Sequence, residues 1–145
     1  MSGVRTIYRY WTAILFLAVL VQVGAAGYGA FYAAQKLGDQ KGEDEHKLIS
    51  EKVFDHGFDF HTGFGYIIFL GAVILLVLAL AARLGRQQVL RVLALPVLVA
   101  IQIVLAWGGE STAIVGIFHP LVAFLIVGFT GSLAYAAWRR VRAIG

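Results

Sequence analysis

Four long apolar runs dominate the chain. They extend from Trp11 to Ala34, from His61 to Ala82, from Val89 to Trp107 and from Ile114 to Trp138. Each run is close to the length of about 20 residues that an α-helix needs to cross a bilayer core of about 30 Å. Four such runs use up most of the 145 residues, so no large extramembrane enzyme domain fits beside them. They also lack the apolar–polar alternation of a membrane β-barrel.

The composition supports a lipid bilayer as the environment of these runs. Apolar residues make up 60% of the chain and charged residues only 14%, compared with about 25% charged residues in ordinary soluble domains. Cysteine is absent, which excludes disulfides, thiolate metal sites and iron–sulfur clusters. The net charge of +4 is explained by membrane topology, and we expect no nucleic-acid partner.

The charged residues are sorted between the connections. Every arginine lies in the N-terminal tail, between the second run and the first turn of the third, or in the C-terminal tail, whereas every acidic residue lies in the other two connections. The positive-inside rule places the arginine side, with both termini, in the cytoplasm. Short connections favour antiparallel neighbours. The sequence therefore predicts an all-α protein of the cell (inner or plasma) membrane: one up-down-up-down bundle of four transmembrane helices over residues 1–145, with an outer loop at about 35–60.

The first run has a second interpretation as a cleaved signal peptide. Arg5 and Arg9 precede it, and small residues follow from Gly24 to Gly27. The run is longer than the roughly 7 to 15 residues of a signal-peptide core, so a membrane span is the preferred interpretation.

The two halves of the chain resemble each other weakly. Similar segments at Val19–Gly24 and Val97–Gln102 each contain one glutamine in an apolar run. The second run opens at His61, and the fourth carries His119 near its own outer end. Two helix pairs of the same orientation are related by a pseudo-twofold axis along the membrane normal. Such an axis would bring His61 and His119 face to face.

These two histidines are the candidate ligands of a cofactor. Polar side chains within membrane spans are costly and usually face the bundle interior, which makes them functional candidates. Two histidines on different helices match the two axial positions of heme iron. A zinc or copper site that adds Asp59 is an alternative. In the simplest alternative, His61 only bonds a carbonyl and His119 only marks a helix boundary before Pro120.

Small and aromatic residues accompany both histidines. Gly65 and Ala123 each lie one helical turn beyond a histidine, where they leave room for a macrocycle. The predicted site thus has His61 and His119 as iron ligands of heme b, with Gly65, Ala123, Phe64 and Phe118 around the ring. Further aromatic side chains are available at Phe58, Phe60, Tyr66 and Phe124, more room at Gly63, and basic partners for the propionates at Lys47 or Lys52.

The remaining polar residues of note have simpler interpretations. We expect Gln22 and Gln102 to form hydrogen bonds between helices rather than to contact a cofactor. His46 and His56 are interpreted as residues of the outer loop. Because of Pro120, the fourth helix either begins near that proline or begins near Ser111 and kinks.

One segment also matches the pattern of a known family. Gln102-Ile-Val-Leu-Ala-Trp-Gly is followed by a short connection and then by His119-Pro-Leu-Val-Ala-Phe. This arrangement resembles the half-repeat of the heme A synthase family, in which a glutamine-containing helix ends in a Leu-Gly turn and the next helix opens with His-Leu-x-x-Ala. In that family the second and fourth helices of each half contribute heme-ligating histidines near the outer face. The resemblance implies that His61 and His119 are an axial pair.

The chain departs from this family in three ways. It has half as many helices, it lacks the loop cysteines, and the family's catalytic glutamate and arginine around the first histidine are missing: Gly57, Phe58 and Asp59 precede His61, and Thr62 follows it. The resemblance therefore implies a heme-holding bundle without heme A synthesis.

Three functions are consistent with the predicted spans and the two histidines. A b-type cytochrome-like protein, which holds one heme between the second and fourth helices for electron transfer or heme handling, is the first and is not expected to be an enzyme. A cofactor-free accessory subunit of a larger respiratory or photosynthetic membrane complex is the second. A transporter is less favoured because no span has a charged residue beyond its first turn. A homo-oligomer is compatible with each of them.

Overall fold

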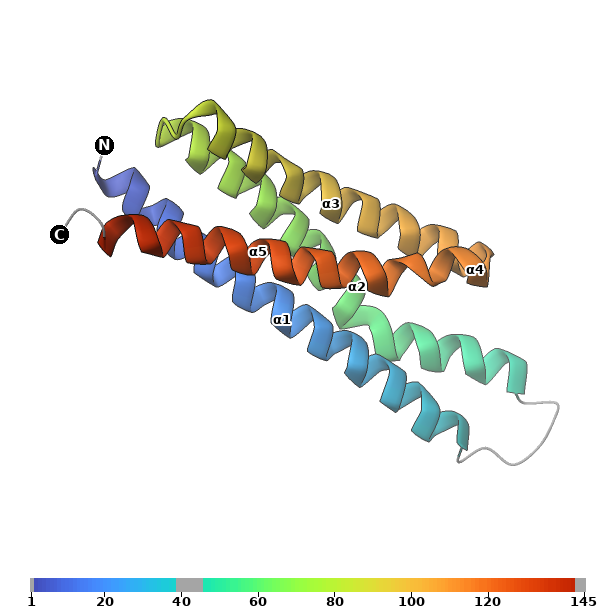
Figure 1. Cartoon of the computed structure of the whole chain (residues 1–145). Coiled ribbons are helices and arrows are strands. Elements are labelled where there is room, and N and C mark those ends of the chain that lie inside the picture. The colour runs from blue at the N-terminus through green and yellow to red at the C-terminus, as the bar shows by residue number, and fades with distance from the viewer. Residues whose placement is uncertain (1, 39–45, 143–145) are drawn as a thin grey trace. The chain divides into compact units, whose positions relative to one another are not determined.

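The computed structural model describes residues 2–38 and 46–142, with side chains described for 3–38 and 52–139. This part of the chain contains helices and no strands (Figure 1). The helices are α1 (Ser2–Gly38), α2 (His46–Ala81), α3 (Arg86–Ser111), α4 (Ala113–Gly116) and α5 (Phe118–Arg142). Four stretches are long and apolar enough to cross a membrane: Gly3–Gly38, Lys52–Ala81, Arg86–Ser111 and Ala113–Arg139. The prediction of an all-helical protein with four candidate spans is thus confirmed.

The chain forms two compact units, which are described separately. The four-helix unit comprises Met1–Leu20 and Ile67–Gly145, and the two-helix unit comprises Val21–Tyr66. Helices α1 and α2 contribute one part to each unit. The arrangement of residues 1–145 as one up-down-up-down bundle stays a prediction.

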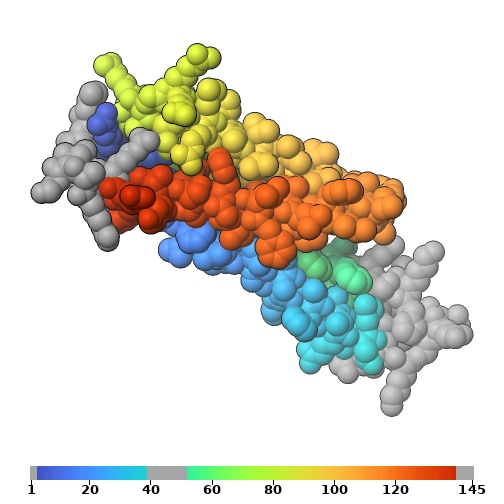
Figure 2. All heavy atoms as spheres, in the orientation of Figure 1, coloured from blue at the N-terminus to red at the C-terminus, as the bar shows by residue number. Residues whose placement is uncertain are grey.

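The four-helix unit has a small apolar core. Leu75, Leu95 and Leu133 of α2, α3 and α5 are almost fully buried, and Thr12 of α1 is buried beside them. Helices α3 and α5 run side by side, and their side chains fill the space between them on the face shown in Figure 2. Large apolar side chains also cover the outside, as expected of helices that face lipid.

An indole hydrogen bond joins two helices of this unit. Trp11 Nε1 donates to the main-chain carbonyl of Gly71 at 2.9 Å. Replacing Trp11 with phenylalanine removes the donor and leaves that carbonyl without it. Because the Gly71 carbonyl keeps its helical N–H partner, we expect the free energy of unfolding to fall by about 1 kcal/mol, the usual net contribution of one hydrogen bond. Unfolding in detergent measures the effect, with the exposed Trp107→Phe as the matched control. Equal losses in both variants would refute this role of the bond.

The two-helix unit depends on a close approach of two backbones. A Cβ atom on Gly29 of α1 would lie 2.7 Å from the carbonyl oxygen of Gly57 on α2, and a Cβ on Gly57 would lie 3.1 Å from the carbonyl oxygen of Gly29. Glycine at position 29 is required for the helices to cross at this distance, and a larger residue at position 57 would be tight, as is typical of contacts between membrane helices.

The hydrophilic stretch at about 35–60 differs in conformation from the predicted loop. Helix α1 continues to Gly38 and α2 already begins at His46, so the described part of this stretch is helical. Lysine, glutamate and glutamine are good helix formers, and hydropathy does not distinguish a polar helix from a loop. Residues 39–45 lie outside the described residues, and the placement of the stretch outside the membrane stays a prediction.

The fourth span begins early and is interrupted. Its first turn is α4, and Ile117 separates this turn from α5, which starts at Phe118. Pro120 explains the interruption, because proline has no N–H to donate to the carbonyl four residues earlier and its ring clashes with that carbonyl. Of the two alternatives considered for this helix, the structure has the one that begins near Ser111.

Candidate functional site

His61 and Gln22 form a reciprocal pair of hydrogen bonds in the two-helix unit. The Nδ1 atom of His61 lies 3.1 Å from the main-chain oxygen of Gln22, and the side-chain Nε2 of Gln22 donates to the main-chain oxygen of His61 at 2.7 Å. A carbonyl oxygen only accepts hydrogen bonds, so Nδ1 of His61 carries a proton. In the neutral ring, the lone pair is then on Nε2.

His119 has the same kind of contact in the four-helix unit. Its Nδ1 atom lies 3.1 Å from the main-chain oxygen of Gln102 on α3. The histidine is in the first turn of α5, two residues after the interruption at Ile117 and directly before Pro120. Nδ1 is therefore the protonated nitrogen here too, and the neutral ring presents Nε2 as a ligand.

The two contacts repeat one local arrangement. In each, a histidine donates through Nδ1 to the main-chain carbonyl of a glutamine on the preceding span. In each, the side-chain Oε1 of that glutamine is buried and has no hydrogen-bond partner among the described residues. Histidines that ligate metals usually donate their second ring nitrogen to a carbonyl or carboxylate, which fixes the tautomer and the orientation of the ring.

Aromatic rings surround His61. Phe58 meets the imidazole edge-on with ring centroids 6.0 Å apart, and Phe60 and Phe64 stack on each other at 5.2 Å. Gly65 provides room for the glutamine: a Cβ there would lie 3.2 Å from Nε2 of Gln22. Its expected place beside a macrocycle stays a prediction, while the space at Gly63 is open.

The surroundings of His119 are more open. Ala123, one turn further along α5, is half-buried, as expected of a small residue on the same face. Phe118 is 54% exposed and Phe124 is 70% exposed. These two rings therefore contribute little to the packing of the four-helix unit.

The other predicted polar residues lie apart from this arrangement. His56 lies on α2 rather than in a loop, exposed, with Nδ1 3.9 Å from Oδ2 of Asp59 and its ring 5.6 Å from that of Tyr32. Lys52 is exposed, and the side chains of His46 and Lys47 lie outside those described. Among the described residues, no group of three or more histidine and acidic side chains gathers into a metal site. The zinc or copper alternative with Asp59 thus gains no support.

The expected pairing of His61 with His119 is not tested by these contacts. His61 belongs to the two-helix unit and His119 to the four-helix unit. Each histidine is described with its own partner, and their approach to a common ligand stays a prediction.

Sequence reasoning anticipated part of this arrangement and missed the rest. The interhelical hydrogen bond of Gln22 is confirmed by its contact with His61. The carbonyl hydrogen bond considered for His61 is present, but its acceptor Gln22 and the acceptor of His119 were missed because a main-chain carbonyl leaves no signature in the sequence. A signal was nevertheless present, since each histidine is on the span after a glutamine-containing run.

Comparison of the chain with protein-family models, with curated proteins and with solved structures found no match.

Proposed function

We propose that this protein is a b-type cytochrome-like membrane protein that holds one heme b, with His61 and His119 as its axial ligands. The observation that carries the proposal is the repeated arrangement in which each histidine donates Nδ1–H to a glutamine carbonyl. The proposal includes the finer topology: an up-down-up-down bundle in the cell membrane, both termini cytoplasmic, and the histidines near the outer face.

The residues around both histidines fit this cofactor. Each imidazole is oriented by a main-chain carbonyl and presents Nε2, the nitrogen that heme iron takes as an axial ligand. The buried Oε1 atoms of Gln22 and Gln102 are acceptors without a protein partner, which favours a bound polar group near each. The aromatic pair Phe60 and Phe64 supplies apolar surface beside His61.

The chain's own residues define what the site does. When bound, heme supplies one-electron chemistry. His61 and His119 occupy both axial positions and so leave no position for oxygen or a substrate, which favours electron transfer or heme handling over catalysis. Gln22 holds the backbone of α1 against that of α2 beside the ligand. We assign no catalytic residue.

A cofactor-free subunit of a larger membrane complex is the second candidate. Tyr28 and Phe31 of the two-helix unit are 65% and 80% exposed, and aromatic side chains of this kind also suit contacts with another membrane protein. This function predicts a colourless protein, whereas the first predicts a coloured one.

The visible spectrum distinguishes these two functions. We expect the protein purified in detergent from cells supplied with heme to show a Soret band, and to gain a sharp α band on addition of dithionite. The reduced-minus-oxidised difference spectrum is the measurement. A featureless spectrum from correctly folded protein would refute heme binding and favour the cofactor-free subunit.

A further inference from the structure

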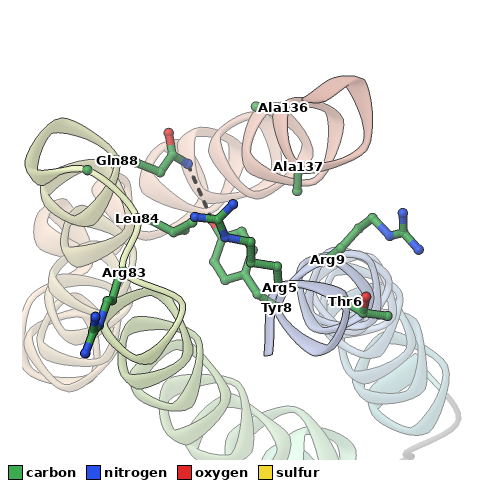
Figure 3. A pocket seen from close by; sticks show the side chains of 10 residues that line it. Arg5, Thr6, Tyr8, Arg9, Arg83, Leu84, Gln88, Ala136 and Ala137 are labelled. Atoms are coloured by element: carbon green, nitrogen blue, oxygen red, sulfur yellow. Dashed lines mark hydrogen bonds between the residues drawn. The ribbon is translucent and has the colours of Figure 1, made fainter. Parts of the chain in front are cut away.

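A cavity of about 270 Å³ lies in the four-helix unit, at the end where α1 begins, α2 turns into α3, and α5 ends (Figure 3). Its walls come from α1, from the turn at Arg83 to Gly85, from α3 and from α5. Gln88 and Tyr8 line it with only 6% and 5% of their surfaces exposed. The cavity thus includes polar side chains that are well buried, which membrane proteins use sparingly and usually for function.

Hydrogen-bond donors converge on this cavity. Figure 3 shows the guanidinium group of Arg5 extending over Tyr8 toward Gln88, while Arg9 and Arg83 turn their guanidinium groups away from Gln88. Arg5 Nε donates to the main-chain carbonyl of Ala82 at 3.4 Å, and Gln88 Nε2 donates to the hydroxyl of Tyr8 at 3.4 Å. Arg5, although exposed, is therefore the lining arginine that extends over Tyr8 and Gln88, and Arg9 and Arg83 add positive charge around it.

The positive charge at this end has no acidic residue to balance it. Glu110 is the only acidic residue in the sequence of the four-helix unit, and it lies near the opposite end of α3 from Gln88. At a rise of about 1.5 Å per residue, the two are about 33 Å apart along the helix. The Nε atom of Arg9 is moreover buried without a hydrogen-bond partner among the described residues. Positive charge at this end is thus not balanced by a carboxylate of the same unit, which favours an anionic ligand.

Aromatic residues indicate where this end lies relative to lipid. The guanidinium carbon of Arg9 is 4.6 Å from the centre of the Trp138 ring and 5.1 Å from that of Tyr10, and these two rings meet edge-on. Tryptophan and tyrosine gather at the level of the lipid headgroups. An anion held beside these rings is therefore at the depth of headgroup phosphates.

We propose that this cavity binds a phosphate group, carried by an anionic phospholipid. A guanidinium group matches two phosphate oxygens at once, and basic pockets between membrane helices bind anionic headgroups. Arg5 would hold the phosphate beside the hydrogen-bonded pair of Gln88 and Tyr8. The proposal depends on residues remote in sequence from His61 and His119, and it stands whether or not the protein binds heme.

Thermal unfolding in detergent, titrated with added ligand, tests this proposal. Phosphatidylglycerol is the probe, phosphatidylcholine is the zwitterionic control, and glycerol 3-phosphate represents a soluble phosphate ester. We expect a saturable rise in unfolding temperature with phosphatidylglycerol alone. Equal stabilisation by glycerol 3-phosphate would keep the phosphate site but overturn its assignment to lipid. Equal stabilisation by phosphatidylcholine would overturn the phosphate site itself.

Two substitutions identify the cation responsible. Arg5→Gln removes the lining charge beside Tyr8 and Gln88 and should weaken phosphatidylglycerol binding about tenfold, the effect of losing a charge-assisted hydrogen bond. Arg86→Gln is the matched control, because Arg86 is exposed at the start of α3 and does not line the cavity. Equal weakening in both variants would overturn the assignment. If Arg5→Gln does not fold, Arg5→Lys provides the test, because lysine keeps the charge but cannot make the bidentate contact. The Arg5→Lys variant should then bind phosphatidylglycerol more weakly than Arg86→Gln does.

Discussion

Replacing either His61 or His119 with alanine is expected to abolish the low-spin heme spectrum. On the proposed ligation each substitution would remove one iron ligand, so that the heme would become high-spin or be lost. We expect retained low-spin heme to fall by about tenfold or more, since even the loss of a residue that only supports a metal ligand costs about 10- to 100-fold in affinity. Visible spectra of the oxidised and reduced variants measure this loss.

Two further observations make that experiment specific. His56→Ala is the matched control, because His56 is on the same helix as His61 but is exposed beside Asp59. We expect its spectrum to equal that of the unmodified protein. Added imidazole should restore the low-spin spectrum of His61→Ala by occupying the vacated axial position. Unchanged spectra in both ligand variants would refute the assignment even if the protein binds heme.

Replacing Gly29 with alanine is expected to destabilise the two-helix unit strongly. The added Cβ would lie 2.7 Å from the main-chain oxygen of Gly57 and 2.9 Å from Cδ1 of Phe58, so the helices must move apart. Overpacking of this kind costs about 1 to 3 kcal/mol. The free energy of unfolding in detergent, measured from the helical circular dichroism signal, reports the effect.

Gly24→Ala is the matched control on the same helix. A Cβ on Gly24 meets nothing within 4 Å, and alanine favours a helix over glycine by about 1 kcal/mol. We expect the control to be as stable as the unmodified protein or more so. If Gly29→Ala were equally stable, the close crossing of α1 and α2 would not contribute to the fold.

Hydropathy predicted the four candidate spans because the cost of exposing a main-chain polar group to lipid forces each apolar run to be helical. The same reasoning gave the wrong conformation for the described residues of the 35–60 stretch, where α2 extends back to His46. Outside the hydrocarbon, a polar helix and a loop have similar hydropathy. Pro120 predicted an irregularity in the fourth span, but only the structure shows that the helix is interrupted at Ile117.

The sequence predicted which side chains belong to the candidate site but not the contacts between them. The positions of His61 and His119 within apolar runs predicted them as functional residues. Their hydrogen bonds to the carbonyls of Gln22 and Gln102 could not be predicted, because they depend on the register between neighbouring helices. When the segments Val19–Gly24 and Val97–Gln102 are aligned, Gln22 and Gln102 differ in position by two residues. Their main-chain oxygens nevertheless make the same kind of contact with a histidine.

The cavity lined by Arg5 could likewise not be predicted from the sequence. The sequence indicated that all arginines share one side, which was interpreted as topology. Only the structure brings Arg5, Tyr8 and Gln88 together, because they come from helices α1 and α3, far apart in the chain.

The most direct test of heme binding is electron paramagnetic resonance of the oxidised protein, with heme and polypeptide quantified in the same sample. The full chain is produced in cells supplied with heme and extracted in detergent. The proposed ligation by His61 and His119 predicts one heme per chain and the low-spin ferric signal of two imidazole ligands. A folded chain that retains no heme, or a high-spin signal in the unmodified protein, would contradict it.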